Sequence, residues 1–232
     1  MLFYHPDLSS NTCILSPEES GHIVKVLRLG VGDQIEVTDG KGTIAKATLI
    51  DTNSRKCCIE IVEKKQSTTP PIKLHLAVSP TKNIDRITWM VEKTVEIGVS
   101  ELSFPICERS ERKVINTGKI VLKAISALKQ SKGAFLPKIN EAAKFKDFIQ
   151  AVHAENEKYI AHLADDSTPD LLTSAKKESS YLVVVGPEGD FTENEISLAK
   201  ENDFKMVKLG NKRLRTETAA LHACSILNAI HY

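Results

Sequence analysis

Long apolar runs and paired cysteine motifs are both missing from this sequence. No hydrophobic segment approaches the roughly 20 residues that a bilayer-spanning helix needs, so no membrane insertion is expected. The N-terminal stretch MLFYHPDLSS lacks the basic-then-apolar order of a secretory signal peptide. The five cysteines form no C-x-x-C motif and are odd in number, which indicates a reducing, cytoplasmic location rather than a disulfide framework.

Metal-binding patterns and a strong charge bias are missing as well. The seven histidines are scattered and none pairs at i, i+4 spacing, so no metal site is expected. The net charge of +1 excludes a uniformly basic nucleic-acid binder. Local basic clusters remain, and each is more often a solvated surface unless several share one face as a phosphate track. The clusters are Arg109 with Arg112-Lys113, Lys129 with Lys132, and Lys212-Arg213 with Arg215.

The first 68 residues are typical of a small β-rich unit. DQIEVTDG, GTIAKATLID and KCCIEIVE alternate apolar and polar residues, and Asp39-Gly40 between two of them predicts a hairpin turn. One short helix is predicted in SPEESGHIVKVLRLG, with Ser16 as its cap and Glu19 at the third helical position. A polar segment with two prolines, residues 64–73, then predicts a linker.

From residue 73 to residue 232, apolar strands alternate with helical segments. This order predicts an α/β domain with a mostly parallel sheet that helices cover on both faces. In such sheets, ligands bind beyond the carboxyl ends of the strands, where turns lead into helices. Trp89 occupies an apolar position of the predicted helix NIDRITWMVEKTVEIG, and we expect it in the core rather than as a platform for a base.

The stretch VVVGPEGDFTENE, residues 183–195, joins an apolar strand to a helix through a glycine turn. Thr192 and Glu195 have the spacing of a capping box, which predicts that the helix begins there. Strand, glycine turn and helix often hold a phosphate, but Glu188 and Asp190 would repel one. The Walker lysine and the G-x-G-x-x-G fingerprint are also missing. A neutral or cationic ligand therefore suits this turn better.

A second strand-to-helix turn lies within KLGNKRLRTETAALHACSILNAI. The strand is predicted to end at Leu209-Gly210, and three cations, Lys212, Arg213 and Arg215, precede a helix that starts at Thr216. The simple interpretation is a helix cap followed by small residues that pack closely. However, cations just before a helix N-terminus are unfavourable to the helix dipole, which favours a role for them in ligand binding.

Together, GPEG-x-F-T-x-x-E and LG-x-x-x-LR-x-ETAA resemble the paired signature of the SPOUT class of RNA methyltransferases. More narrowly, the chain resembles the bacterial 16S ribosomal RNA uridine-N3 methyltransferase family. HIVKVLRLGVGDQIEVTDGKG is similar to the PUA-like β-barrel of that family, and VEKTVEIGVSELSFPICERSERK and ALKQSKGAFLPKI are similar to its central segments. The resemblance implies a PUA-like RNA-binding domain at residues 1–68 and a SPOUT domain with a C-terminal trefoil knot at residues 73–232.

The sequence departs from the pattern of this family at four positions. Asp190 replaces the second glycine of G-P-E-G-G, and Lys212 and Arg213 replace an arginine and an isoleucine. Lys132 stands where arginine is common after Gln-Ser. A lysine in place of arginine keeps the positive charge but loses the bidentate geometry of the guanidinium, so the contacts of Lys132 and Lys212 with phosphates or bases are expected to differ.

The resemblance implies S-adenosyl-L-methionine as cofactor, held between the two glycine turns. This cofactor carries a sulfonium cation and no phosphate, which is consistent with a turn that has acids and no lysine. The implied reaction is methyl transfer to N3 of a uridine in 16S ribosomal RNA or the small ribosomal subunit. The expected cofactor-binding residues are Leu163, Gly186, Pro187, Glu188, Gly189, Leu209, Gly210, Leu214, Thr218 and Ala219.

Arg215 and Glu217 are the candidate catalytic residues. The uridine imide must lose a proton, and a fixed guanidinium such as Arg215 could stabilise the negative charge on its carbonyl oxygens. A phosphate clamp is an equal alternative for Arg215. Glu217 either accepts a hydrogen bond from the substrate or favours the helix N-terminus, and no general base is assigned.

RNA is expected to contact basic residues in both domains, in contacts that position it rather than read its sequence. Lys25 and Arg28 lie on the predicted N-terminal helix, and Arg109, Arg112 and Lys132 are expected near strand ends of the catalytic domain. The remaining candidate is Lys212. The family pairs its subunits through the knotted domain, which implies a homodimer, although packing within one subunit also accounts for the small-residue helix.

Three other functions stay open at this stage. One is a related knotted methyltransferase that acts on another base or RNA. The second is a non-catalytic RNA-binding factor in ribosome assembly, for which lost cofactor turns would be evidence, and both turns are present. The third, a nicotinamide-dependent enzyme, is supported only by the strand-helix alternation and lacks its fingerprint.

Overall fold

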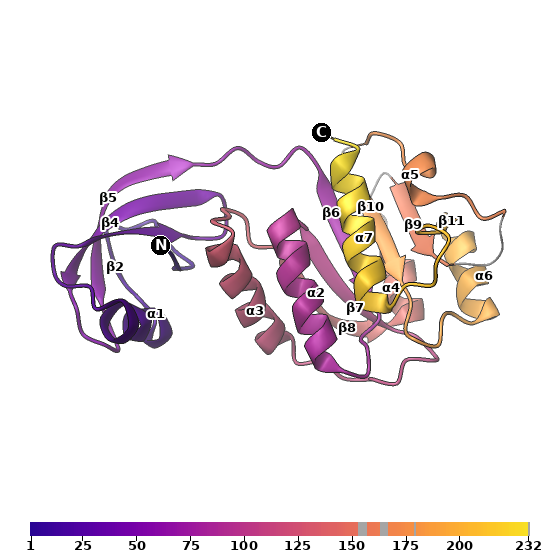
Figure 1. Ribbon diagram of the computed structural model, residues 1–232, viewed down its shortest axis with the longest axis horizontal. Helices are drawn as coiled ribbons and strands as arrows, with labels where there is room; N and C mark the ends of the chain where they lie inside the picture. The colour runs from indigo at the N-terminus through magenta and orange to yellow at the C-terminus, as the bar shows by residue number, and fades with distance from the viewer. Residues whose placement is uncertain (153–156, 163–166, 179, 232) are drawn as a thin grey trace. The chain divides into compact units, whose positions relative to one another are not determined.

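The computed structural model describes residues 1–152, 157–162, 167–178 and 180–231. The chain forms two compact units (Figure 1): Met1–Thr69 with Ile125–Leu136, and Pro70–Ala124 with Pro137–Tyr232. The second segment of the first unit is the end of helix α3 (Thr117–Gln130) and the turn after it. Lys132 lies in this segment and has a φ of 55°. Because the segment is part of the first unit, Lys132 does not lie at the strand ends of the catalytic domain, where we expected it.

The first unit contains a five-stranded mixed sheet. The strands, in the order β1-β3-β4-β5-β2, are β1 (Leu2–Tyr4), β3 (Gln34–Thr38), β4 (Thr43–Asp51), β5 (Cys58–Gln66) and β2 (Thr12–Ile14). Only β1 and β3 pair in parallel. The hairpin turn between β3 and β4 is confirmed, since the Asp39 Oδ1 accepts the backbone N–H of Lys41 at 2.7 Å and that of Thr43 at 3.0 Å.

The predicted N-terminal helix is confirmed at its start and differs at its end. In α1 (Pro17–Gly21), the Ser16 hydroxyl accepts the Glu19 N–H at 3.2 Å. The chain then continues as a π-helix, η1 (His22–Leu27), with Lys25 exposed on it and Arg28 ending it at a φ of 55°. The carboxylate of Glu19 is buried and accepts from the Lys129 ammonium at 2.6 Å, which ties α1 to the α3 segment.

The second unit is built on a six-stranded sheet in which all strands are parallel, which confirms the α/β prediction. In the order β11-β9-β10-β6-β7-β8, the strands are β11 (Lys205–Val207), β9 (Glu157–Ala161), β10 (Ser180–Val185), β6 (Lys73–Val78), β7 (Glu101–Ile106) and β8 (Lys138–Lys144). Every residue of β10 is buried, as expected for a central strand with both faces covered.

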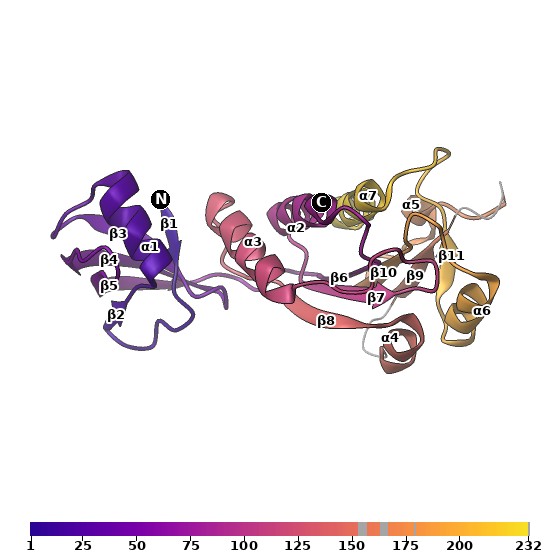
Figure 2. The same ribbon diagram turned by 90° about the horizontal axis from the view of Figure 1, so that it is seen from below.

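Helices cover both faces of this sheet (Figure 2). Helices α2 (Ile84–Ile97) and α7 (Thr216–Ala229) pack together on one face, with α5 (Leu171–Ser174) beside α7. Helices α4 (Phe145–Ala151) and α6 (Glu193–Glu201) pack on the other. None of the helices in the described part of the chain is long and apolar enough to cross a membrane.

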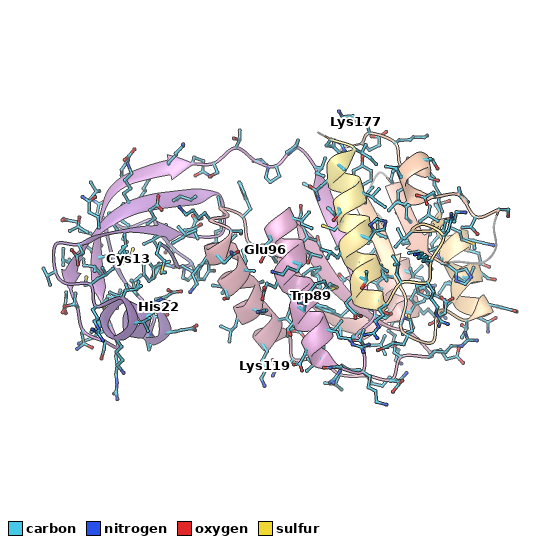
Figure 3. All side chains as sticks on the ribbon, in the orientation of Figure 1. Cys13, His22, Trp89, Glu96, Lys119 and Lys177 are labelled. Atoms are coloured by element: carbon cyan, nitrogen blue, oxygen red, sulfur yellow. The ribbon has the colours of Figure 1, made fainter. Side chains whose placement is uncertain are left out.

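The expectation that Trp89 lies in the core is wrong for the single chain. Its side chain is 43% exposed on α2, where Figure 3 labels it. The reason is helical geometry: the buried face of α2 contains Ile87, Met90 and Val91, and successive residues turn by about 100° around the helix. Position 89 therefore falls nearly opposite the centre of the buried face.

Candidate active site

A cavity of about 440 Å³ lies at the carboxyl ends of β9, β10 and β11. Its walls are the turns after these three strands, together with the first turns of α2 and α7. This is the edge at which parallel sheets bind ligands. Seven predicted cofactor-binding residues line the cavity: Gly186, Pro187, Glu188, Leu209, Gly210, Leu214 and Ala219. Gly189 and Thr218 are exposed nearby without lining it, and Leu163 lies outside the described residues.

The glycine turn after β10 is held tightly by its neighbours. A Cβ atom at Gly186 would lie 2.9 Å from the ring of Phe191, so no larger residue fits without a shift. The Thr216 hydroxyl donates a hydrogen bond of 3.0 Å to the Gly186 carbonyl, which joins the turn to the start of α7. The Arg109 guanidinium donates to the carbonyls of Gly189 at 3.1 Å and Phe191 at 3.2 Å. Arg109 therefore braces the turn.

The capping box that closes this turn is confirmed. The Glu195 N–H donates to the Thr192 hydroxyl at 3.3 Å, and the Glu195 carboxylate accepts the Thr192 N–H at 2.9 Å. The other oxygen of that carboxylate accepts the Glu108 N–H at 2.9 Å. Because the box uses these groups, the N-terminus of α6 has fewer free N–H groups for an anion.

Asp190 fits its turn in spite of its departure from the usual glycine. Its φ is 62°, in the left-handed region that favours glycine and that aspartate enters more readily than most residues. The carboxylate accepts the Phe191 N–H at 2.8 Å and contacts His162 Nδ1 at 3.1 Å. His162 follows β9 and also lines the cavity, although the sequence analysis did not identify it.

The turn after β11 carries the cations that the sequence analysis singled out. Gly210 has a φ of 87°, and its N–H donates to the carboxylate of Asp170 at 3.1 Å. The Arg213 guanidinium donates to the Glu188 carbonyl at 3.3 Å, so this turn contacts the turn after β10. Lys212, Arg213 and Arg215 are all exposed at the cavity, and Arg215 precedes α7 without capping it.

Two acidic residues at the cavity, Glu188 and Glu217, each have one buried carboxylate oxygen without a hydrogen-bond partner among the described residues. The other oxygen of Glu188 accepts the Lys82 N–H at 3.1 Å. Glu217 lies in the first turn of α7 and is 7% exposed. Its Oε1 lies 3.7 Å from Nε of Arg86, which comes from the first turn of α2 and lines the cavity. Glu217 itself is set behind the cavity wall.

Sequence reasoning missed Arg86, although a signal for it was present. An arginine in the first turn of a helix is unfavourable to the helix dipole, as are the cations before α7. The helix that has Arg86 in its first turn also follows the carboxyl end of a strand, β6. The same argument that drew attention to Arg215 therefore applies to Arg86.

The predicted RNA-binding residues lie in several places. In the second unit, the Arg112 guanidinium donates to the carbonyls of Thr81 at 3.0 Å and Lys82 at 2.6 Å, so it braces a loop as Arg109 does. Lys25 and Arg28 are exposed in the first unit. No group of three metal-binding side chains occurs within residues 1–152, 157–162, 167–178 and 180–231.

Comparisons with known proteins match both the N-terminal and the C-terminal part of the chain. The family described as RNA methyltransferase domain matches residues 68–228, and the family described as RNA methyltransferase PUA domain matches residues 15–62. The chain is 28% identical over 230 residues to ribosomal RNA small subunit methyltransferase E of Bacillus subtilis, covering 94% of this chain and 90% of that protein. It is 31% identical over 232 residues to the protein of the same name from Aquifex aeolicus, covering 97% and 98%.

Solved structures give the same result. A probable rRNA-methyltransferase from Porphyromonas gingivalis aligns with a TM-score of 0.91 and 34% identity, covering 100% of this chain and 99% of that one. A ribosomal RNA small subunit methyltransferase E from Neisseria gonorrhoeae, bound to S-adenosyl methionine, aligns with a TM-score of 0.88 and 28% identity, covering 99% and 97%. This chain therefore belongs to the RNA methyltransferase family that includes ribosomal RNA small subunit methyltransferase E.

Proposed function

We propose that this protein transfers a methyl group from S-adenosyl-L-methionine to N3 of a uridine in the 16S ribosomal RNA of the small subunit. The observation that carries the proposal is the meeting of the two glycine turns at one cavity. The turn after β10 contributes Gly186 and acidic side chains, and the turn after β11 contributes Gly210 and cations. Membership of the family supports the reaction class. The two central segments that resemble the uridine-N3 methyltransferases, VEKTVEIGVSELSFPICERSERK and ALKQSKGAFLPKI, support the uridine target.

The residues of the cavity fit S-adenosyl-L-methionine. A volume of about 440 Å³ is within the range of ligand pockets. Leu209, Leu214 and Ala219 supply apolar surface for an adenine, and the two turns supply backbone polar groups. The carboxylates of Glu188 and Asp190 favour a cationic ligand. When bound, the cofactor supplies a methyl group on a positively charged sulfur, and the Neisseria relative carries it.

The protein's contribution is to orient the uridine and to stabilise the charge that develops on it. Arg215 is exposed at the cavity, where its guanidinium can stabilise an anionic uracil oxygen or hold a phosphate. Lys212 lies beside it and can contact the RNA backbone. Arg109 and Arg112 also contact RNA in this proposal, in addition to bracing loops, and Lys25, Arg28 and Lys132 do so in the first unit. Glu217 belongs to the same site, as do Leu163, Gly189 and Thr218 on the cofactor side.

Four further features belong to the proposal. The division at residues 1–68 and 73–232 separates RNA docking from chemistry. The C-terminal part of the second unit is threaded as a trefoil knot, two subunits pair through it, and the protein works in the cytoplasm. Exposed Trp89 on α2 is consistent with pairing, because it leaves a large apolar side chain uncovered in the single chain.

A methyl-transfer assay tests the function. The protein is incubated with tritiated S-adenosyl-L-methionine and either small ribosomal subunits, free 16S RNA or transfer RNA from a strain that lacks the gene. Labelled RNA is then digested to nucleosides and separated. Label in N3-methyluridine from 16S RNA is the expected result. Label in another nucleoside would overturn the target, and no labelling of any RNA by a protein that binds the cofactor would overturn the ribosomal substrate.

A further inference from the structure

We propose that Arg86 is a catalytic residue that contacts the target uracil, and that buried Glu217 is the positioning residue that holds it. The inference rests on the proposed function, and it replaces a direct substrate contact for Glu217. Two observations support the inference: Arg86 lies in the cavity wall, and the carboxylate of Glu217 is buried behind that wall.

Glu217 is in an environment that requires a cation. The residue is 7% exposed, and its Oε2 has no hydrogen-bond partner in the described part of the structure. A buried carboxylate is unfavourable unless it is paired, and the dipole of α7 compensates only part of that penalty. The ion pair that the structure shows for Glu217 is with Arg86, at 3.7 Å from Nε to Oε1. This distance is an ion-pair contact and is too long for a hydrogen bond.

Arg86 lies in the wall of the cavity, where a cation could contact the substrate. Its side chain is 35% exposed and lines the cavity from the first turn of α2. No hydrogen bond of its guanidinium is found within the described residues, so several N–H groups are available to a ligand. Its place at a helix N-terminus is unfavourable for helix stability, and therefore helix formation does not account for it.

Three other cations of the cavity are held differently. Arg213 donates to a backbone carbonyl, and Lys212 and Arg215 are exposed in the turn before α7. Arg86 differs from these three, because its ion-pair partner among the described residues is a buried carboxylate. Electrostatic catalysis depends on a charge that is oriented before the reaction starts, and the buried Glu217 carboxylate supplies a counter-charge that orients Arg86.

The chemistry requires such a charge. The N3–H proton of the uridine passes to solvent, the N3 lone pair then forms the bond to the methyl carbon, and the electron pair of the broken C–S bond stays on sulfur. Between these events the negative charge lies on N3 and the adjacent carbonyl oxygens. Arg86 stays protonated throughout and donates to one of those oxygens, which lowers the free energy of the anion. Glu217 takes no proton in this scheme.

The variants Arg86→Ala, Arg86→Lys and Glu217→Gln test the proposal. The matched controls are Arg55→Ala, an exposed arginine of the first unit, and Glu193→Gln, an exposed carboxylate in the first turn of another helix, α6. Single-turnover methyl transfer is followed from pH 6 to 10 with small ribosomal subunits as substrate. Binding of S-adenosylhomocysteine is measured by calorimetry, and each variant's unfolding midpoint is recorded.

We expect Arg86→Ala to slow methyl transfer by roughly 10²–10³-fold while the affinity for S-adenosylhomocysteine changes by less than about threefold. Its rate should continue to rise at a pH where the wild-type rate has levelled off, because the uracil anion has lost its stabilising charge. Added guanidinium ion should restore part of the rate. Glu217→Gln should slow transfer by roughly tenfold, and much less in the Arg86→Ala background, because the two residues act as one unit. Arg86→Lys should fall between.

Three results would overturn the inference. The first is a rate for Arg86→Ala within twofold of wild type. The second is an equal loss of rate and of S-adenosylhomocysteine affinity, which would place Arg86 at the cofactor. The third is a pH profile that keeps its wild-type midpoint in both Arg86 variants. If the wild-type protein itself transfers no methyl to uridine N3, the proposed function fails instead, and the two failures are distinguished by that reaction.

Discussion

Replacement of Gly186 by alanine tests the packing of the turn after β10. The new Cβ would lie 2.9, 3.1 and 3.2 Å from three carbon atoms of the Phe191 ring. That ring is 3% exposed and packs against Phe145 with ring centroids 5.6 Å apart, so it cannot move aside freely. Either the ring or the turn has to shift, and the turn is a wall of the cavity.

The expected destabilisation follows from this overlap. Forcing one extra carbon into a packed site costs about 1–3 kcal/mol. If the turn shifts rather than the ring, the same free energy is lost from cofactor binding, and every 1.4 kcal/mol corresponds to about a tenfold change in affinity. If the ring shifts, we expect Gly186→Ala to lower the free energy of unfolding by about 1–3 kcal/mol. If the turn shifts, we expect S-adenosylhomocysteine to bind roughly tenfold or more weakly. If both shift, each effect should be smaller.

Urea unfolding and calorimetric titration measure the two effects. Phe191→Leu removes part of the ring, so Gly186→Ala should be milder in that background, by more than about 0.5 kcal/mol. Gly210→Ala is a contrast, because its φ of 87° makes the backbone strained while no atom lies within 4 Å, and Phe191→Leu should not relieve it. Gly30→Ala, which also meets no atom within 4 Å, is the neutral control. If Gly186→Ala behaves like the neutral control in both assays, the steric argument is refuted.

Three other experiments have defined outcomes. Thr216→Val removes the 3.0 Å hydrogen bond to the buried Gly186 carbonyl and should lower the free energy of unfolding by about 1–2 kcal/mol in urea titrations; no change would mean that water replaces the hydroxyl. Burial is the largest influence on the pKa of Glu157 and would raise it, but the hydrogen bonds from Lys205 at 2.6 Å and from the Tyr159 hydroxyl, together with the charges of Lys205 and Lys176, outweigh burial and hold that pKa below its usual range. The resulting stability is present above the ordinary glutamate pKa and is lost as the pH falls through the lowered one. Lys205→Met should therefore destabilise by about 1 kcal/mol at pH 7, with a difference that shrinks below about pH 4, and a difference independent of pH would contradict this. Burial raises the pKa of Cys107 to about 12, so mass spectrometry should find it unalkylated by iodoacetamide at pH 8 in the folded protein and alkylated in urea; equal labelling in both states would contradict its burial.

Features that depend on a few neighbouring residues could be predicted from the sequence. The Ser16 cap, the Asp39 turn and the box between Thr192 and Glu195 are all confirmed by hydrogen bonds. Each is decided by side chains that reach backbone groups within about four residues, so the local sequence contains the information. The parallel sheet was predictable for a similar reason, because alternating strands and helices leave few other arrangements.

Features that depend on distant segments could not be predicted in the same way. Arg86 meets Glu217 only because α2 packs against α7 across 131 positions of the chain, and His162 meets Asp190 because β9 and β10 are neighbours in the sheet. Nothing near Arg86 in the sequence indicates that partner. The prediction that Trp89 is buried was wrong because it was based on the apolar residues next to Trp89 in the sequence. Which face of α2 is buried depends instead on the elements that α2 packs against.

The distribution of charge around the cavity explains how one site can serve two ligands of opposite charge. In the proposed function, the cofactor is a cation at its reactive sulfur and the RNA is a polyanion. The turn after β10 presents the carboxylates of Glu188 and Asp190, whereas the turn after β11 presents Lys212, Arg213 and Arg215. The hydrogen bond from Arg213 to the Glu188 carbonyl keeps the two turns in contact. Glu188→Lys would place a positive charge on the turn after β10, so that both turns would carry cations. This substitution should therefore weaken binding of the cationic cofactor as well as changing the binding of RNA.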